Sequence, residues 1–249
     1  TTLADDLLQI LLDPQAIFAS RSIVGKALIE LAVEVDWPTT LHTLEGYGDE
    51  LSIRLAIELI GAIGYESFGN NFIVELVIAH AKVAGRTAGV LMGLERRLPE
   101  SKIEGVLDCL AKAVKTLGKP SERPGNDDLT DLANQLIVRA LSVGGITAEK
   151  LWSWMEPFDT RMGYRHETRQ QRDAFIQTDD TLRRAVQRFV LLDLPSEHST
   201  WQRAWRMSDR STAFTPTADD VLALLAALNP ADRIDERWKD LVQLTQHAG

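Results

Sequence analysis

The chain has 249 residues, of which 45% are hydrophobic and 25% charged, a balance typical of a globular protein that can bury a core without disulfides. The formal net charge of -9 argues against a protein that binds nucleic acid mainly through phosphates, and a single cysteine, Cys109, excludes an internal disulfide. The first residues lack the pattern of a secretion signal, and the most apolar stretch, 72–81, is too short to span a bilayer. We therefore expect a cytoplasmic protein without a membrane segment.

Apolar residues recur every three to four positions in the first part of the chain, and this spacing predicts helices rather than strands. Three apolar stripes come first: Leu3, Leu7, Ile10 and Leu11; Ile23, Ala27, Leu28, Leu31 and Val35; and Ile53, Ile57, Ile60 and Ile63. We expect Asp36-Trp37-Pro38 to close the second helix, and Gly61 and Gly64 to lie near the end of the third.

Three more helices are predicted before the middle of the chain, over 72–82, 87–98 and 101–117. Ser101 and Glu104 have the spacing of a capping box at the start of the last one, and Gly118 is a suitable stop. The segment that follows, KPSERPGN at 119–126, combines proline and glycine and is the best candidate for a linker or long loop.

The second half is predicted to be helical as well. Asn126 can cap a helix that runs to about 143, Gly144 and Gly145 form a turn, and Thr147 can cap a helix that ends near Pro157. Further helices are expected at about 163–177, 179–192, 199–208, 216–228 and 233–246. Thr217 and Asp220 resemble a capping pair for the 216–228 helix.

Helices joined by short loops indicate an all-α fold, either a bundle or a stack of helical hairpins. KALIELAVEVD (26–36) and RLAIELIGAIG (54–64) share Ile-Glu-Leu, and 102–114 has similar spacing, which favours a degenerate HEAT/armadillo-like α-solenoid or superhelix. A bundle without repeats is the alternative. The expected domains are HEAT-like repeats at 1–118, the linker at 119–126, and an Arg/Trp-rich helical subdomain at 127–249 packed on the first.

Two segments invite a catalytic or metal-binding interpretation. Residues 20–27 are similar to a phosphate-binding loop, but Ser20 and Ala27 stand where that loop needs glycine and a magnesium-binding hydroxyl. Asp127, Asp128 and Asp131 have the spacing of a diphosphate-binding acidic motif, although carboxylates after a capping residue also stabilise a helix N-terminus.

The remaining reactive side chains do not gather into a motif in the sequence. The histidines, at positions 42, 80, 166, 198 and 247, do not have zinc-ligand spacing. His80 and Cys109 lie on apolar helix faces and are expected in the core. We therefore predict no catalytic residue, no metal site and no cofactor.

The most distinctive region is 152–210, where all ten positive charges are arginines and four tryptophans occur. Arginine and tryptophan together can bind a phosphate, a nucleotide or an acidic peptide. The candidate contact residues are Arg165, Arg169, Arg172, Arg184, Arg188, Trp201 and Trp205. In the alternative interpretation, the arginines pair with nearby carboxylates such as Asp173 and Asp180, and Trp201 and Trp205 are buried between helices.

Several long segments of the sequence resemble segments of one known protein family. They are LWSWMEPFDTRMGYRHETRQQRDAFIQTDDTLRRAVQRFVLLDLP, WQRAWRM, FTPTADDVLALLAALNPADRIDERWKDLVQL, ELSIRLAIELIGAIGYESFGNNFIVELVIAHA and GLERRLPESKIEGVLDCL. Together they look like the helical repeat region that follows the ATPase domain in large bacterial NACHT-type STAND NTPases. The nucleotide-binding motifs of that family are absent from this chain, so no catalytic residue carries over.

The resemblance implies a part that senses, autoinhibits or supports an NTPase, in a family many of whose members defend bacteria against phages. We therefore expect a non-catalytic helical scaffold, sensor or regulatory region whose partner is a protein or the NTPase module of the same polypeptide. A HEAT-like nucleic-acid-binding protein or DNA glycosylase that uses the Arg/Trp region is the alternative, and a purely structural linker is a third hypothesis.

Overall fold

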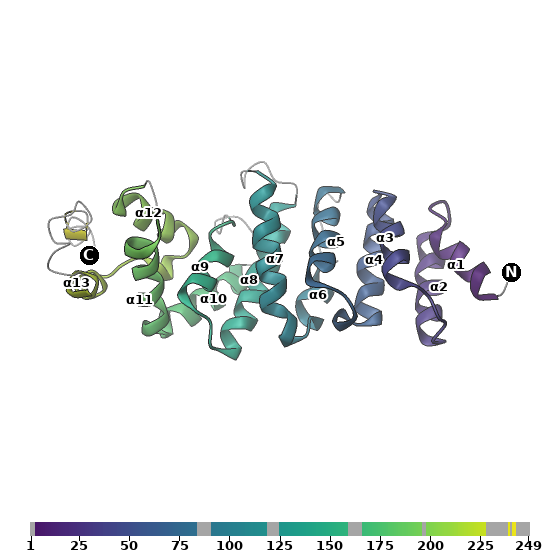
Figure 1. Ribbon diagram of the computed structural model, residues 1–249, viewed down its shortest axis with the longest axis horizontal. Helices are drawn as coiled ribbons and strands as arrows, with labels where there is room; N and C mark the ends of the chain where they lie inside the picture. The colour runs from purple at the N-terminus through teal and green to yellow at the C-terminus, as the bar shows by residue number, and fades with distance from the viewer. Residues whose placement is uncertain are drawn as a thin grey trace. The chain divides into compact units, whose positions relative to one another are not determined.

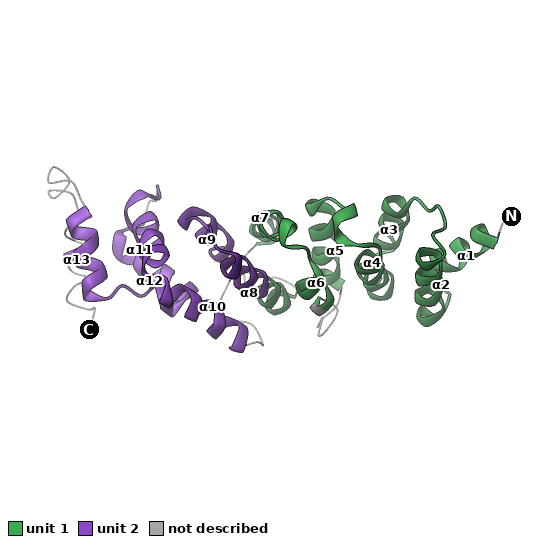
Figure 2. Cartoon of the chain, turned by 90° about the horizontal axis from the view of Figure 1, so that it is seen from below, with its two compact units in different colours: residues 1–132 green, residues 133–249 purple. Residues whose placement is uncertain are grey.

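The computed structural model describes residues 3–83, 91–118, 125–158, 166–195, 198–227, 239 and 241–242. Over these residues it contains thirteen α-helices and no strand (Figure 1). The predicted all-α class is therefore confirmed. The chain divides into two compact units, residues 1–132 and 133–249 (Figure 2).

Unit 1 is built from helices that pack against the next helix in the chain or the one after it. Its elements are α1 (Leu3–Leu12), α2 (Phe18–Glu30), α3 (Trp37–Gly46), α4 (Glu50–Ile63), the 3-10 turn η1 (Tyr65–Ser67), α5 (Asn70–Val83), α6 (Met92–Arg97), α7 (Glu100–Thr116) and the beginning of α8 (Asn126–Val143). Helix α1 packs on α2, α2 and α3 pack on α4, and α5 packs on both α4 and α7. Unit 1 thus consists of packed pairs of adjacent helices.

The apolar stripe of α4 forms much of the core of unit 1, as its spacing predicted. Ile53, Ile57 and Ile60 are buried against the neighbouring helices. Asp49 caps the helix by accepting the Ser52 backbone N–H at 2.9 Å. Gly64 ends it with φ +111°, a backbone conformation that favours glycine.

The stripe predicted for α2 is wrong, because the helix buries its other face. Ile23 and Leu31 are 68% and 67% exposed, and only Leu28 of the predicted stripe is buried. Gly25 lies so close to α4 that a Cβ there would stand 2.7 Å from Leu59 Cδ2. Helix α2 therefore packs through Arg21, Ser22 and Gly25 as well as Leu28, and hydrophobic periodicity does not detect such a mixed face.

Helix α3 was not predicted. Asp36 does not close the preceding helix but begins α3, because its carboxylate accepts the Thr39 backbone N–H at 3.3 Å and the Thr39 hydroxyl at 2.7 Å. Pro38 in the first turn has the fixed φ that suits a helix start. Asp36-Trp37-Pro38 therefore marks the start of α3 rather than the end of the preceding helix.

The predicted capping box of α7 is also wrong. The helix begins at Glu100 after Pro99 and has no side-chain hydrogen bond at its N-cap, so Ser101 lies within the first turn. The predicted stop is confirmed, since Gly118 has φ +88°.

Unit 2 consists of the rest of α8, α9 (Ala148–Met155), α10 (His166–Thr178), α11 (Asp180–Arg188), the π-helix η3 (Phe189–Asp193), α12 (Thr200–Arg210), the 3-10 turn η4 (Thr212–Phe214) and α13 (Ala218–Ala227). Gly144 and Gly145 both have positive φ, as expected of the turn between α8 and α9. Thr147 caps α9 by accepting the Lys150 N–H, also as predicted. Trp154 and Phe214 are fully buried and form part of the core.

Other predicted segments lie partly or wholly outside the described residues. These are the start of the 87–98 helix, residues 119–124 of the linker, the first part of the 163–177 helix, and most of the 233–246 helix.

Candidate functional site

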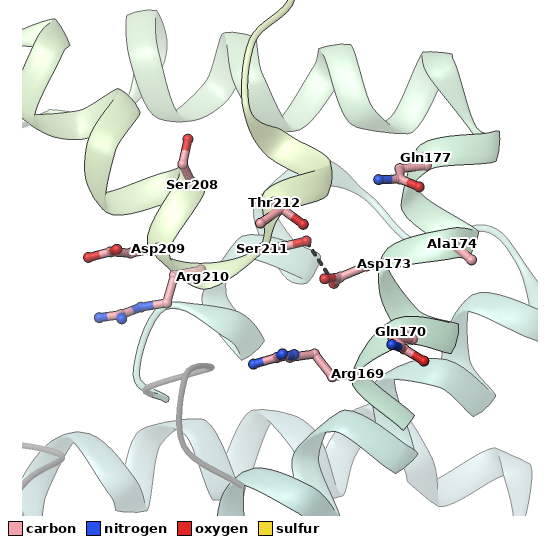
Figure 3. A pocket seen from close by; sticks show the side chains of 10 residues that line it. All are labelled: Arg169, Gln170, Asp173, Ala174, Gln177, Ser208, Asp209, Arg210, Ser211 and Thr212. Atoms are coloured by element: carbon pink, nitrogen blue, oxygen red, sulfur yellow. Dashed lines mark hydrogen bonds between the residues drawn. The ribbon is translucent and has the colours of Figure 1, made fainter. Parts of the chain in front are cut away.

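A polar pocket of about 680 Å³ lies between α10 and the C-terminal end of α12 (Figure 3). Arg169, Asp173 and Gln177 line one side of it. They follow one another at intervals of four residues, which places them on one face of α10. Ser208 to Thr212, from the end of α12 and the start of η4, line the other side. The pocket therefore presents cationic, anionic and hydroxyl groups on two rigid elements.

A buried guanidinium supports this pocket from beneath. Arg172 is fully buried and donates to Asp173 Oδ1 at 2.9 Å from Nε and at 2.6 Å from Nη2. Its Nη1 donates to Asn134 Oδ1 of α8 at 2.6 Å, and Nη2 also donates to the Arg210 carbonyl at 3.1 Å. One side chain thus joins α8, α10 and the last turn of α12.

The C-terminal end of α12 is held by further hydrogen bonds. Ser211 Oγ donates to Asp173 Oδ1 at 2.7 Å and accepts the Ala213 backbone N–H at 3.1 Å (Figure 3). Arg210 Nε donates to the Glu156 carbonyl at the end of α9, at 2.9 Å. The pocket walls are therefore fixed before any ligand arrives, which limits the entropy lost on binding.

A second charged cluster lies where α11 meets the start of α13. Asp220 is buried, and its Oδ1 accepts from Arg183 at 3.1 Å and from Arg184 at 3.0 Å. Its Oδ2 accepts the Gln187 amide and the Thr217 backbone N–H, both at 3.2 Å, while Thr217 Oγ1 accepts the Asp220 N–H. The predicted Thr217–Asp220 capping pair is confirmed.

Hydrogen bonding dominates the electrostatics of Asp220. Burial by itself would raise the pKa of this carboxyl. The hydrogen bonds from Thr217, Gln187, Arg184 and Arg183 outweigh burial and hold the pKa well below its usual value. Asp220 is therefore a charged structural anchor for two helices.

Two large aromatic side chains on α12 are exposed. Trp205 is 63% and Trp201 42% accessible to solvent. The structure therefore does not bury them between the helices of unit 2, which was one of the alternatives from the sequence. They are four residues apart and share one face of α12. Trp205 precedes Ser208 and Asp209 of the pocket by one turn, so the aromatic face continues toward the pocket.

The predicted contact residues lie in several different places rather than at one site. Arg165 lies outside the described residues. Arg169 lines the pocket, Arg172 is buried beneath it, and Arg184 belongs to the Asp220 cluster. Arg188 is exposed and forms an ion pair of 3.5 Å with Asp193. Several arginines thus pair with carboxylates of the same unit, as the alternative interpretation proposed.

The side chains that form hydrogen bonds within these clusters were not identified from the sequence. Asn134, Gln187 and Ser211 lie 27 to 38 positions from the groups they bond, among them the carbonyl of Phe214. No local pattern marks such residues. The capping spacing at Asp220 was the one local signal, and it indicated a helix start rather than an arginine cluster.

The motifs considered in unit 1 take structural positions. Residues 20–27 lie inside α2, where Arg21 is buried and donates to the Leu11 carbonyl and Ser52 Oγ, both at 3.0 Å. Asp127 and Asp128 lie in the first turn of α8. Within the described residues, no group of three or more His, Cys, Asp or Glu side chains is arranged to hold a metal ion.

His80 is fully buried in α5, as expected. Cys109 is half-buried rather than buried, and its Sγ lies 2.9 Å from Asn71 Oδ1. Burial and the nearby Asp108 raise the pKa of the Cys109 thiol, which opposes thiolate formation.

No family model, curated protein or solved structure matches this chain. Among the described residues, no helix combines the length and apolar character needed to cross a membrane.

Proposed function

We propose that this chain is a non-catalytic helical scaffold that recognises a protein partner, and that it is the sensor or regulatory region of a larger bacterial NACHT-type STAND NTPase with a role in defence against phages. The recognition surface consists of Trp201 and Trp205 of α12 together with the polar pocket beside them. The observation that carries the proposal is the exposure of two tryptophans on one face of a helix.

Exposed tryptophan pairs favour protein recognition for an energetic reason. Each tryptophan can bury about 150–250 Å² of surface, and tryptophan and arginine are the residues that contribute most to the binding free energy of protein interfaces. The neighbouring pocket adds Arg169 and several hydroxyl groups at fixed positions. An apolar anchor beside polar groups of fixed geometry is the usual arrangement of a specific interface.

The nucleic-acid alternative receives less support from the same geometry. Arg172, Arg183 and Arg184 are bonded to Asp173 or Asp220, so their charges are already compensated within the unit. The net charge of the chain is also negative. Binding to a DNA duplex at low salt would favour this alternative, because phosphate contacts are strongest there.

The first test concerns the parent protein. The reading frame upstream of this segment should encode a phosphate-binding loop, and the separately expressed NTPase module should bind this chain in isothermal titration calorimetry. A parent gene without such a loop would exclude the STAND assignment.

The second test concerns the surface. A double Trp201→Ala, Trp205→Ala variant should weaken that binding at least tenfold, since a truncated interface tryptophan commonly costs about 2 kcal/mol or more. Ile23→Ala is the matched control, because Ile23 is an exposed apolar residue of α2 in unit 1. Equal losses in both variants, or unchanged binding in the double variant, would exclude the α12 surface.

A further inference from the structure

A second pocket of about 350 Å³ lies in unit 2 among α9, η3 and α12. Trp152 and Glu156 come from α9, Val190 and Leu194 from η3 and its end, and Arg206 from α12. Its size is that of a site for a small organic molecule. None of these residues lines the α10–α12 pocket.

An unusual backbone element shapes this pocket. The Leu194 N–H donates to the Phe189 carbonyl at 2.7 Å, which closes a turn of η3 over five residues instead of four. Arg203 Nη1 holds this turn by donating to the carbonyls of Val190 and Leu194, at 3.2 and 3.1 Å. Single π-turns are rare and are found often at functional sites.

Two donors that line the pocket form no hydrogen bond with other described residues. Trp152 is 5% exposed, and its Nε1–H has no acceptor among them. This nitrogen is closed to solvent, but a buried donor left unpaired is unfavourable, so a small shift of the indole toward an acceptor in the pocket would be stabilised. Arg206 is exposed and has no ion pair within the described part of the chain. Among the described residues that line the pocket, Arg203 and Arg206 also outnumber the one carboxylate, Glu156.

We propose that this pocket binds a small organic carboxylate with an apolar body. The carboxylate oxygens accept hydrogen bonds from Arg206 and from the Trp152 indole, and the hydrocarbon part packs on Val190, Leu194 and Pro195. Guanidinium–carboxylate bonds are charge-assisted and are therefore stronger than bonds to a neutral amide. The proposal is independent of the recognition surface on α12, so either can fail without the other.

The test follows the indole N–H signals of the whole chain by ¹H–¹⁵N NMR, since the six tryptophans give at most six such peaks. A Trp152→Phe variant identifies the Trp152 peak by its absence. Hexanoate should move this peak downfield, because the N–H gains an acceptor, while hexanamide, acetate and inorganic phosphate should move it much less. N-acetyl-leucine serves as a mimic of a peptide C-terminus and distinguishes that source of the carboxylate from a free acid.

Arg206→Gln should weaken hexanoate binding about tenfold, the loss expected for one charge-assisted hydrogen bond, and should leave the weak hexanamide response unchanged. Arg206 is exposed, so the fold should tolerate this change. Arg96→Gln, an exposed arginine of α6 in unit 1, is the matched control and should bind hexanoate like the wild type. A Trp152 peak that does not move with hexanoate, or equal affinities for hexanoate and hexanamide, would overturn the proposal.

Discussion

At the residue scale, buried polar side chains should determine how the stability of this protein responds to pH and to substitution. Asp220, Arg172 and His80 are all inaccessible to solvent, yet their surroundings differ. The first two are surrounded by hydrogen-bond partners, whereas neither ring nitrogen of His80 has one among the described residues. Since burial disfavours a charge unless hydrogen bonds or an opposite charge compensate it, the three should respond differently to pH and to substitution.

Asp220→Asn should lower stability at neutral pH and change its dependence on pH. The folded pKa of Asp220 lies below the unfolded value near 3.8, so its contribution is complete above that value and is lost as the pH falls below it. The difference in unfolding free energy between wild type and variant should therefore shrink below about pH 4. Urea titrations across this range measure it, and a pH-independent difference would contradict the assignment.

His80→Phe should remove an acid-sensitive element of unit 1. Burial lowers the pKa of His80 despite the opposing carboxylates of Glu50 and Asp128, while Arg54 also lowers it. The unfolded chain therefore binds this proton more readily, and the wild type loses stability as the pH falls below about 6.5. The variant should lose less stability than the wild type between pH 7 and 5 in thermal melts. An identical loss in both proteins would show that His80 does not titrate on unfolding.

At the scale of the helix, the close approach of α2 to α4 determines which face of α2 is buried. Helix α2 turns Arg21 and Gly25 inward and leaves Ile23 exposed. The small residue allows contact with Leu59 and Leu11, and the buried guanidinium uses carbonyl and hydroxyl acceptors on α1 and α4. Local hydrophobicity therefore misassigned this face.

Gly25→Val should destabilise unit 1 by about 1–3 kcal/mol, because a Cβ at this position meets Leu59 at 2.7 Å and Leu11 at 3.3 Å in a filled core. Gly93→Val on α6 is the control, since a Cβ there meets no atom within 4 Å. Chemical denaturation measures both variants. Similar stabilities would mean that α2 can move away from α4 at little cost.

At the scale of the whole molecule, each of the two compact units has its own set of buried side chains. The Arg172 network belongs to unit 2, and the α4 core belongs to unit 1. Local stability in such a chain need not be uniform, because each unit can open separately.

Arg172→Ala should reduce the stability of unit 2 by about 3–5 kcal/mol, the loss expected when a buried ion pair keeps only its carboxylate. Hydrogen exchange should accelerate in α10, α12 and η4 and stay unchanged in α4 and α5. Arg206→Ala, which removes an exposed arginine of the same unit, should leave all of these rates close to wild type. Faster exchange in α4 would show that the units unfold together.

The helical content, most helix positions and several caps could be predicted from the sequence. Thr147, Gly118 and the Thr217–Asp220 pair act within a few residues of their own position, so local spacing identifies them. The start of α3 carried an equally local signal at Asp36 that we misinterpreted. The arginine-rich region was also recognised, but only as a list of candidates.

The sequence by itself determined that this chain is helical, because helix periodicity and capping depend on neighbours within about four positions. Tertiary structure decided which arginines are buried, which tryptophans are exposed and where the α10–α12 pocket and the Trp152 pocket lie. Those outcomes depend on partners such as Asn134 for Arg172 and Asp220 for Arg184, which lie more than thirty positions away. Only the packing of helices brings such groups within hydrogen-bond distance.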